Sequence, residues 1–430
     1  MERDALKRLY RRCDPSEAIS PEDDRYVVFE PELRGDDWTA RVHRSITRSV
    51  EPTCTLLSGP PGCGKSTELR RLVHMFRQGT DGESGYFPVL IDAGDFSDLS
   101  GQINAAAMLT GIVHHTGHRV LEAVGEGPDK VPLKDYTYAF ESQFQLRAEG
   151  SGDALVFEQF LEQIRATLFE CMRRVGKPLV VIVDSLNTIQ GESATWAAVL
   201  RSAEQFFRAA PRFRLPVHVV YTVPPGLLTR NVPGIDFMPM IRVRERGRPA
   251  PCAPGIDALR ELVRRRISDA ALHVLLGEHH ESRIRQAIQW SAGSPRALLL
   301  ILREVLVSAE FPLSGSSWSR VQSEIFDQYV PLVYSKDLGL LAQIHASGYL
   351  SLDHADELDT LARLLETNLL SYYRNSESWF DVNPAMLELP HFQRRSSVRK
   401  VMMCSRRRDR LRVGGRGPRF RPRPSFACCG

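Results

Sequence analysis

The sequence has few of the features that mark secreted or membrane-spanning proteins. Its eight cysteines form no C-x-x-C pair and follow no regular spacing, which favours a reducing compartment over a disulfide framework. No run approaches the roughly 18 to 20 apolar residues that a membrane-spanning helix needs. Residues 1–12 are charged rather than apolar, so we expect no signal peptide. These absences predict a cytoplasmic protein without a membrane anchor.

Lysine is also scarce, and the basic charge is concentrated at one end of the chain. Only seven of the 56 basic residues are lysine. Residues 394–430 hold 13 of the 56 basic residues and one of the 52 acidic ones, so the rest of the chain has a net charge of −8. Dense arginine with few apolar residues predicts a disordered tail. This Arg-rich tail could bind nucleic acid or an acidic partner, or it could be a solvated extension without a role.

The sequence does contain a complete phosphate-binding loop of the form G-x-x-x-x-G-K-[ST]. An apolar run at 53–57 precedes the loop and an amphipathic helical pattern follows it, which is the context that the motif requires. Its glycines let backbone N–H groups turn toward a β-phosphate, Lys65 would reach the β- and γ-phosphates, and the Ser66 hydroxyl would bind Mg²⁺. The loop residues are Gly59, Pro60, Pro61, Gly62, Cys63, Gly64, Lys65, Ser66 and Thr67.

This loop predicts binding of a nucleoside triphosphate. No N-K-x-D motif for reading guanine is visible in the sequence, which favours ATP over GTP. With 430 residues, of which 43% are hydrophobic, the chain is long enough for two or three domains with cores of their own.

A second element of the nucleotide site is expected at Asp184. An unbroken apolar run at 179–183 precedes it, as in a strand buried on both faces of a parallel sheet. At the carboxyl edge of that sheet Asp184 would hold Mg²⁺, directly or through water. Strands at 87–92, 217–222 and 237–243, alternating with helical stretches, complete a doubly wound α/β fold.

Thr222 ends one of these strands where the γ-phosphate would lie. It could sense that phosphate, or it could simply terminate the strand before a turn. Between the second and third strands, residues 97–176 predict a helical insertion that packs on the sheet, with helix-like segments at 103–113 and 157–171. His114, His115 and His118 in this insertion fit no familiar metal-ligand pattern, and we interpret them as a solvated helix end.

Beyond residue 250 the pattern becomes helical. Segments at 256–267, 273–276 and 284–290 lead to Gly293-Ser294-Pro295-Arg296, which opens another apolar helix. Gly293 suits the end of one helix and Pro295 the first turn of the next. Arg296 would then project toward the γ-phosphate, or it would be a surface residue at a helix start.

Together these motifs resemble the AAA+/STAND branch of P-loop ATPases, over roughly residues 35–390. The resemblance is carried by the phosphate-binding loop, the strands ending in Asp184 and Thr222, and the Pro295-Arg296 motif. It implies a P-loop NTPase sheet sandwiched by helices, followed by an all-α lid and a winged-helix domain. It also implies that Pro295 contacts nucleotide and that Arg296 acts as a second sensor.

Residues 318–390 resemble the winged-helix domain that commonly follows such a lid. Helices are predicted at 318–333, 338–346 and 355–366, before two aromatic strands around a polar turn at 374–378. A domain of this kind can read DNA. Residues 352–374 carry five carboxylates, however, which would repel phosphate. We therefore favour a wing that binds protein or regulates the ATPase.

One departure from the resembled families bears on turnover. STAND-type sequences carry an acidic pair shortly after the strand's aspartate, where this chain has Asn187 and Thr188; AAA+ enzymes usually carry Glu where this chain has Ser185. Asn and Thr can orient a water but cannot take its proton, so a general-base contribution of about 10²–10⁴-fold is missing. Glu192 could substitute. The sequence thus predicts slow hydrolysis. Candidates for an arginine finger are Arg230, Arg242 and Arg244.

The predicted function is a regulatory ATPase of AAA+/STAND type that binds Mg-ATP and presents a nucleotide-dependent conformation to a partner. A protein partner would bind through the helical insertion or the winged helix, and a nucleotide-dependent oligomer is conceivable. An initiator- or loader-like DNA-binding ATPase and a non-hydrolysing nucleotide-dependent scaffold are the alternatives. The predicted parts are an N-terminal extension (1–34), a P-loop ATPase domain (35–250), a helical lid (251–312), a winged-helix-like domain (313–393) and the Arg-rich tail (394–430).

Overall fold

The computed structural model describes most of the chain up to residue 393. Asn187, Thr188, Glu192 and the Arg-rich tail lie outside the described residues. None of the described helices has the length and apolarity that a bilayer crossing would require. The described residues are 2–79, 85–96, 103–126, 154–186, 193–230, 232–246, 250–349, 357–375, 377–390 and 392–393.

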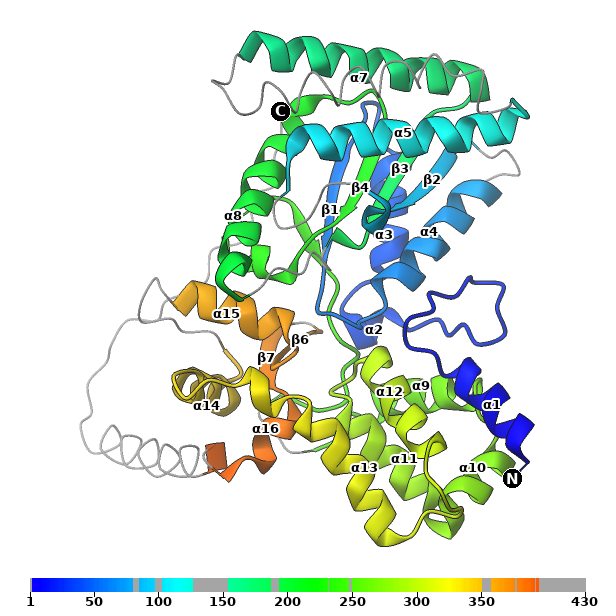
Figure 1. The fold of residues 1–430 in the computed structure, drawn as a ribbon, viewed down its shortest axis with the longest axis vertical. Coiled ribbons are helices and arrows are strands. Elements are labelled where there is room, and N and C mark those ends of the chain that lie inside the picture. The colour runs from blue at the N-terminus through cyan, green and yellow to red at the C-terminus, as the bar shows by residue number, and fades with distance from the viewer. Residues whose placement is uncertain are drawn as a thin grey trace, which may run out of the picture.

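A five-stranded parallel sheet forms the centre of the fold (Figure 1). Its spatial order is β2-β3-β4-β1-β5, so β1 lies between β4 and β5 although it comes first along the chain. The register of β2 against β3 sets Asp92 beside Asp184 at the carboxyl edge. The strands are β1 (Cys54–Ser58), β2 (Phe87–Asp92), β3 (Leu179–Asp184), β4 (His218–Thr222) and β5 (Ile235–Phe237).

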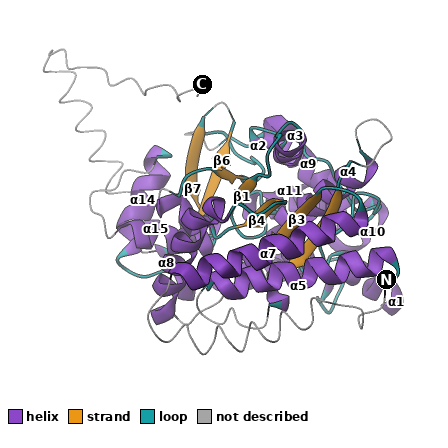
Figure 2. Cartoon of the chain, turned by 90° about the horizontal axis from the view of Figure 1, so that it is seen from above, coloured by secondary structure: helices purple, strands orange, loops and turns teal. Residues whose placement is uncertain are grey.

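Helices cover both faces of this sheet. Val180 and Ile182 of β3 meet the helices of one face, whereas Val181 and Val183 meet those of the other, because successive strand residues point to opposite faces. Figure 2 shows α5 and α7 lying side by side. The predicted α/β sheet between helical layers is confirmed. One face carries α3 (Trp38–Thr47) and α4 (Lys65–Gln78); the other carries α5 (Ala105–Val124), α7 (Ala154–Val175) and α8 (Ser193–Ala209).

The last strand is shorter than the sequence predicts. An apolar run at 237–243 was expected to be strand throughout, but β5 ends at Phe237. The next residues bond to three separate segments instead: Met240 N–H donates to Tyr372, Ile241 N–H to Gly293 and Arg242 N–H to Leu33. Residues 238–243, which we call the connector, are apolar because they are buried between the sheet and the lid, and not because they extend the sheet.

A helical lid follows the connector, as predicted. Its helices are packed around one core, onto which the first helix of the chain also folds. Arg303 of the lid holds its guanidinium 4.0 Å from the ring centre of Tyr10, so the N-terminal segment is attached to the lid. The lid helices are α9 (Ala253–Arg264), α10 (Asp269–Leu276), α11 (His280–Trp290) and α12 (Pro295–Leu306); the N-terminal helices are α1 (Arg3–Arg12) and α2 (Pro31–Arg34).

The remaining elements, from α13 to α16, form what we call the C-terminal unit. It contains the predicted aromatic hairpin and three helices near the predicted positions, although the helix predicted at 318–333 ends at Asp327. Its assignment as a winged helix and the predicted domain boundaries stay predictions. Its elements are α13 (Gly315–Asp327), α14 (Asp337–Ser347), α15 (Glu357–Glu366), β6 (Leu370–Arg374), β7 (Ser378–Val382) and α16 (Pro384–Glu388). β6 and β7 pair antiparallel.

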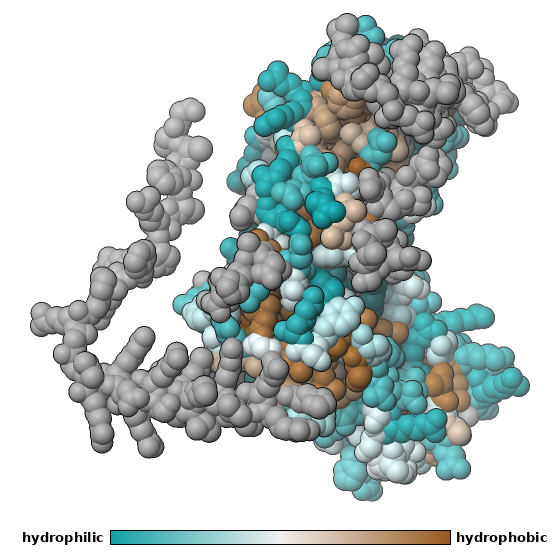
Figure 3. Space-filling view, turned by 60° about the vertical axis from the view of Figure 1, so that its left-hand side comes forward, coloured by the Kyte–Doolittle hydropathy of each residue, from teal (hydrophilic) through white to brown (hydrophobic). Residues whose placement is uncertain are grey.

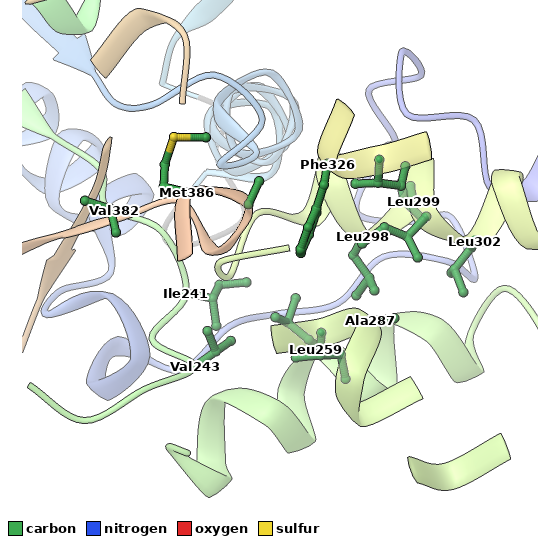
Figure 4. Packing of buried hydrophobic residues seen from close by; sticks show 14 of the residues in the cluster. Ile241, Val243, Leu259, Ala287, Leu298, Leu299, Leu302, Phe326, Val382 and Met386 are labelled. Atoms are coloured by element: carbon green, nitrogen blue, oxygen red, sulfur yellow. The ribbon is translucent and has the colours of Figure 1, made fainter. Parts of the chain in front are cut away.

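The β6–β7 hairpin joins two hydrophobic cores. Its residues Tyr372, Phe380 and Val382 belong to the core of the lid, whereas Tyr373 and Trp379 belong to the core beneath α3 and α4. Figure 4 shows the lid core, in which side chains of the connector, the lid helices and the C-terminal unit gather. Since protein cores are close-packed, the hairpin couples the lid mechanically to the P-loop domain.

The described surface is mixed in character. Figure 3 shows hydrophilic areas interspersed with smaller apolar ones. The large apolar side chains that are exposed include Val50, Phe169 and Val307 from separate elements, and Val330, Leu332 and Tyr334, which follow one another closely between α13 and α14.

Candidate nucleotide site

The phosphate-binding loop connects β1 to α4, and its backbone is shaped by glycine. Gly62 and Gly64 have φ values of 81° and 101°, a region that favours glycine. A Cβ on Gly62 would lie 2.7 Å from the Cβ of Arg296, and one on Gly59 would lie 2.4 Å from the carbonyl oxygen of Met238. The loop therefore needs glycine both for its turn and for the close approach of neighbouring chain.

Lys65 opens α4 with its ammonium held at the loop. Its Nζ donates to the carbonyl oxygens of Gly59 at 2.7 Å and Pro60 at 3.3 Å, and the residue is only 5% exposed. Ser66 and Thr67, the next residues of the helix, line the same cleft. The N-terminus of α4, with its unpaired N–H groups and the Lys65 charge, is suited to a phosphate group.

Asp184 lies at the carboxyl end of β3 and lines the same cleft as Lys65 and Ser66. It is buried, and its Oδ1 accepts the N–H of Ser185 at 2.7 Å. Both residues line the cleft together with Asp92. Ser185 has a φ of 67°, which is uncommon outside glycine. No group of three or more His, Cys, Asp or Glu side chains within the described ranges is arranged to hold a metal ion by itself.

Thr222 is at the end of β4, where the sequence places it, but it does not line the cleft. It is fully buried, and its Oγ1 donates to the carbonyl oxygen of Val183 at 3.4 Å. The hydroxyl thus lies one residue from Asp184 in the neighbouring strand. A sensor role for Thr222 stays a prediction.

The lid reaches the phosphate-binding loop through the residues that the sequence singled out. The N–H of Arg296 and the hydroxyl of Ser294 both donate to the carbonyl oxygen of Gly62, each at 3.3 Å. Pro295 and Arg296 line the cleft with Lys65. These contacts place the start of α12 directly on the loop. The fold is that of a P-loop NTPase with a helical lid.

The cleft of this P-loop fold measures about 960 Å³ and extends well beyond the loop. One wall is the N-terminal segment of residues 15–29, which the sequence analysis missed. Arg34, just beyond this segment, donates from its guanidinium to the carbonyl oxygen of Cys63 at 2.7 Å. Leu262 and Arg266 of the lid side complete the wall. This wall could not be found from the sequence, because a segment far from the motif in sequence carries no local signal of the contact.

Among the residues that the structure describes, three buried polar atoms of cleft-lining residues have no hydrogen-bond partner: the Tyr26 hydroxyl, the Arg34 Nε and the Arg266 Nε. Buried polar groups are normally hydrogen-bonded, so such a set fits a site built for a polar ligand. Burial lowers the pKa of Arg266 to about 10 and raises that of Tyr26. The glycine loop, the Lys65 ammonium and these donors together fit a nucleotide with its phosphates at α4.

The C-terminal unit also touches the phosphate end of the site, which sequence reasoning did not foresee. Asn368 donates from Nδ2 to the carbonyl oxygen of Pro61 at 3.0 Å. The Glu366 Oε1 accepts the N–H of Gly226 at 3.0 Å. Burial raises the pKa of Glu366 to about 7, although the Gly226 N–H and the Lys65 charge favour its ionised form.

The three arginines that were candidates for an arginine finger have partners within the chain. Arg230 pairs with Asp359 of α15, and Arg244 pairs with Asp381 of β7 at 3.2 Å. The Nη1 of Arg242 lies 3.8 Å from the Oε2 of Glu245. Two of the three therefore attach the C-terminal unit to the rest of the molecule.

No family model matches the chain, and no curated protein matches it. Solved structures are similar at low identity. The Walker-type ATPase PABY2304 of Pyrococcus abyssi is 14% identical with a TM-score of 0.44, covering 87% of this chain and 97% of that one. The ADP form of the Aeropyrum pernix ORC2 protein is 15% identical with a TM-score of 0.46, covering 92% and 98%. Drosophila ORC bound to DNA is 12% identical with a TM-score of 0.40, covering 89% and 91%.

Proposed function

We propose that the chain is an ATP-binding regulatory ATPase whose lid and C-terminal unit respond to the nucleotide. The observation that carries this proposal is the bonding of lid and loop: Arg296 N–H and the Ser294 hydroxyl both donate to Gly62 of the phosphate-binding loop. A change at the phosphates therefore acts on the lid without an intermediary. This direct contact supports a switch.

The residues of the loop would bind the phosphates by charge and by backbone donors. Lys65 would turn its ammonium from the Gly59 and Pro60 carbonyls toward the β- and γ-phosphates. The Ser66 hydroxyl and the Asp184 carboxylate would hold Mg²⁺ at the carboxyl edge. Bound Mg²⁺ would offset the phosphate charge and so favour transfer to water. Pro295 and Arg296 would meet the phosphates from the lid side, and Thr222 would sense them through the β4 end.

Hydrolysis is expected to be slow, because the usual base is missing. Ser185 follows Asp184 directly and has a hydroxyl where AAA+ enzymes usually carry a carboxylate. A hydroxyl can orient a water but does not accept its proton at neutral pH. A slow site suits a switch, since the ATP-bound conformation must last long enough for a partner to detect it.

A regulatory role is favoured over DNA reading by the placement of the hairpin. Tyr373 is fully buried and Trp379 is 3% exposed, and their rings stack with centroids 4.4 Å apart. The guanidinium of Arg374 lies 5.3 Å from the Trp38 ring of α3. A hairpin packed in this way is occupied by contacts within the chain, so it would have to leave them before it entered a DNA groove.

The proposal is tested by calorimetric titration with Mg-ATP and by phosphate release. We expect saturable binding of one nucleotide and turnover near or below about 1 s⁻¹, the low end for enzymes. A protein that binds neither ATP nor ADP would refute the proposal. The initiator-like alternative would gain if salt-dependent DNA binding survived removal of residues 394–430. Tight ATP binding with no phosphate release at all would favour the scaffold alternative.

A further inference from the structure

A second carboxylate, that of Asp92, lies beside Asp184 at the carboxyl edge of the sheet. Asp92 is the last residue of β2, and the register of the sheet pairs it with Asp184 at the end of β3. Neighbouring strands are about 4.8 Å apart, so the two carboxylates leave the sheet next to each other. Asp92 also lines the same cleft as Lys65, Ser66 and Asp184. It is therefore part of the phosphate end of the nucleotide site.

The Asp92 carboxylate is held in place and is also open to water. The residue is exposed, and β2 is the outer strand of the sheet. Its Oδ1 accepts the N–H of Gly94 at 2.9 Å, and a Cβ on Gly94 would lie only 3.2 Å from that oxygen. Within the described residues the second oxygen, Oδ2, has no hydrogen-bond partner. One oxygen thus fixes the side chain, and the other can receive a proton.

The other carboxylates that line the described cleft are already engaged, apart from Asp95. Asp184 accepts the Ser185 N–H and is the proposed ligand of Mg²⁺. Asp95 forms no salt bridge within the described residues, but it lies in the short helix η1 (Ala93–Asp95), beyond the edge of the sheet. Asp92 is thus the strand-end carboxylate that is left for proton transfer. The glutamates of the cleft have ion-pair partners: Glu17 pairs with Arg25, Glu22 with His74, Glu68 with Arg71 and Glu122 with Arg119.

Hydrolysis of ATP requires such a proton acceptor. The oxygen of a water bonds to the γ-phosphorus, and the bond from that phosphorus to the oxygen shared with the β-phosphate breaks. The attacking water must also lose a proton, which the Ser185 hydroxyl does not accept at neutral pH. A carboxylate on the neighbouring strand can accept it, directly or through one further water. The proton then passes to solvent, and ADP and phosphate leave.

We propose that Asp92 is the general base of this site. The inference rests on the proposed function and names the residue through which the slow hydrolysis proceeds. Aspartate is one methylene shorter than the glutamate that AAA+ enzymes usually carry after the strand's aspartate, and the Gly94 N–H occupies one of its two oxygens. Both features make proton transfer inefficient. Hydrolysis is then slow but not absent, which separates this site from a non-hydrolysing scaffold.

The test measures phosphate release at saturating Mg-ATP and the dissociation constant for Mg-ATP by calorimetry, both on the full chain. Asp92→Asn keeps an oxygen that can accept the Gly94 N–H but removes the proton acceptor. We expect turnover to fall about 100-fold and the dissociation constant to stay within about twofold. Asp92→Glu should match or exceed the turnover of the wild type, because it restores a carboxylate with a longer reach.

The matched control is Asp95→Asn, which makes the same change three residues further along the chain and should leave turnover and affinity unchanged. Turnover of Asp92→Asn within about threefold of the wild type would overturn the inference. So would a loss in Asp92→Glu as large as in Asp92→Asn, or an equal loss in Asp95→Asn, which would be an effect of cleft charge only. A loss of ATP affinity that matched the loss of turnover would make Asp92 a metal or phosphate ligand instead.

Failure of this inference is distinguishable from failure of the proposed function. If the wild type bound ATP and released no phosphate, Asp92 would not be a base, while nucleotide binding would stand. If the wild type bound neither ATP nor ADP, the proposed function itself would fail.

Discussion

The backbone N–H of Arg296 donates to the carbonyl oxygen of Gly62 at 3.3 Å, so the first turn of the lid helix rests on the phosphate-binding loop. Both residues are at positions that the motifs predicted. Gly62 and Arg296 are far apart in the sequence, so it is the fold that brings the start of the lid helix α12 onto the phosphate-binding loop.

Lys65→Ala is expected to weaken Mg-ATP binding by roughly 100-fold, the scale of a lost charge-assisted contact. Lys65 is only 5% exposed, and its Nζ donates to two backbone carbonyl oxygens. Its loss should therefore also lower the free energy of unfolding, by about 1 kcal/mol. Calorimetry and denaturant unfolding measure the two effects. Lys336→Ala on the C-terminal unit is the control, and equal affinity in both variants would contradict the assignment of Lys65.

Gly62→Ala is expected to reduce both stability and nucleotide affinity. The new Cβ would meet the Arg296 Cβ at 2.7 Å, and the φ of 81° is strained for alanine. The strain at such a φ costs on the order of 1–3 kcal/mol.

The control for Gly62→Ala is Gly234→Ala. Gly234 has a similar φ of 75°, but a Cβ there would meet nothing within 4 Å. The two variants therefore share the backbone strain, and only Gly62→Ala disturbs the contact between loop and lid. Thermal unfolding and ATP titration of both separate the two effects. If Gly62→Ala and Gly234→Ala lowered the unfolding temperature and the ATP affinity equally, the contact between the lid and the loop would contribute nothing to stability or to binding.

The stability of the protein should depend on pH through Glu366. Burial raises the pKa of Glu366 from 4.5 to about 7, so between these values the folded state holds a proton that the unfolded state has released. The Glu366 contribution to the free energy of unfolding therefore falls as pH rises from about 4.5 to 7, and its cost is complete above that range. Relative to wild type, Glu366→Gln should be more stable at pH 8 and nearly equal at pH 5. A constant difference across this range would show that Glu366 has an ordinary pKa.

Local patterns predicted the elements of the site, and they failed where contacts span the chain. The apolar run before Asp184 identified β3, because a strand buried on both faces has few other compositions. Pro295 and Arg296 were found because a helix start has its own residue preferences. Glu366 and Asn368 carried no such signal, since their role arises only when α15 docks on Gly226 and Pro61. For the same reason the wall formed by residues 15–29 was missed.

Turnover should be slow in the wild type, near or below about 1 s⁻¹, and should respond to restored carboxylates at specific positions. Asn187→Asp combined with Thr188→Glu places the acidic pair of the resembled families after Asp184, and we expect faster phosphate release without tighter ATP binding. Ser185→Glu tests the other family pattern and is expected to fail, because the φ of 67° at Ser185 is strained for glutamate. Phosphate release under saturating Mg-ATP distinguishes the variants.

If the wild type already turned over tens of times per second, a base would be present elsewhere. Glu192 would then be the first residue to substitute. Fast hydrolysis would also contradict the proposed switch, because the ATP-bound state would not last long enough for a partner to detect it.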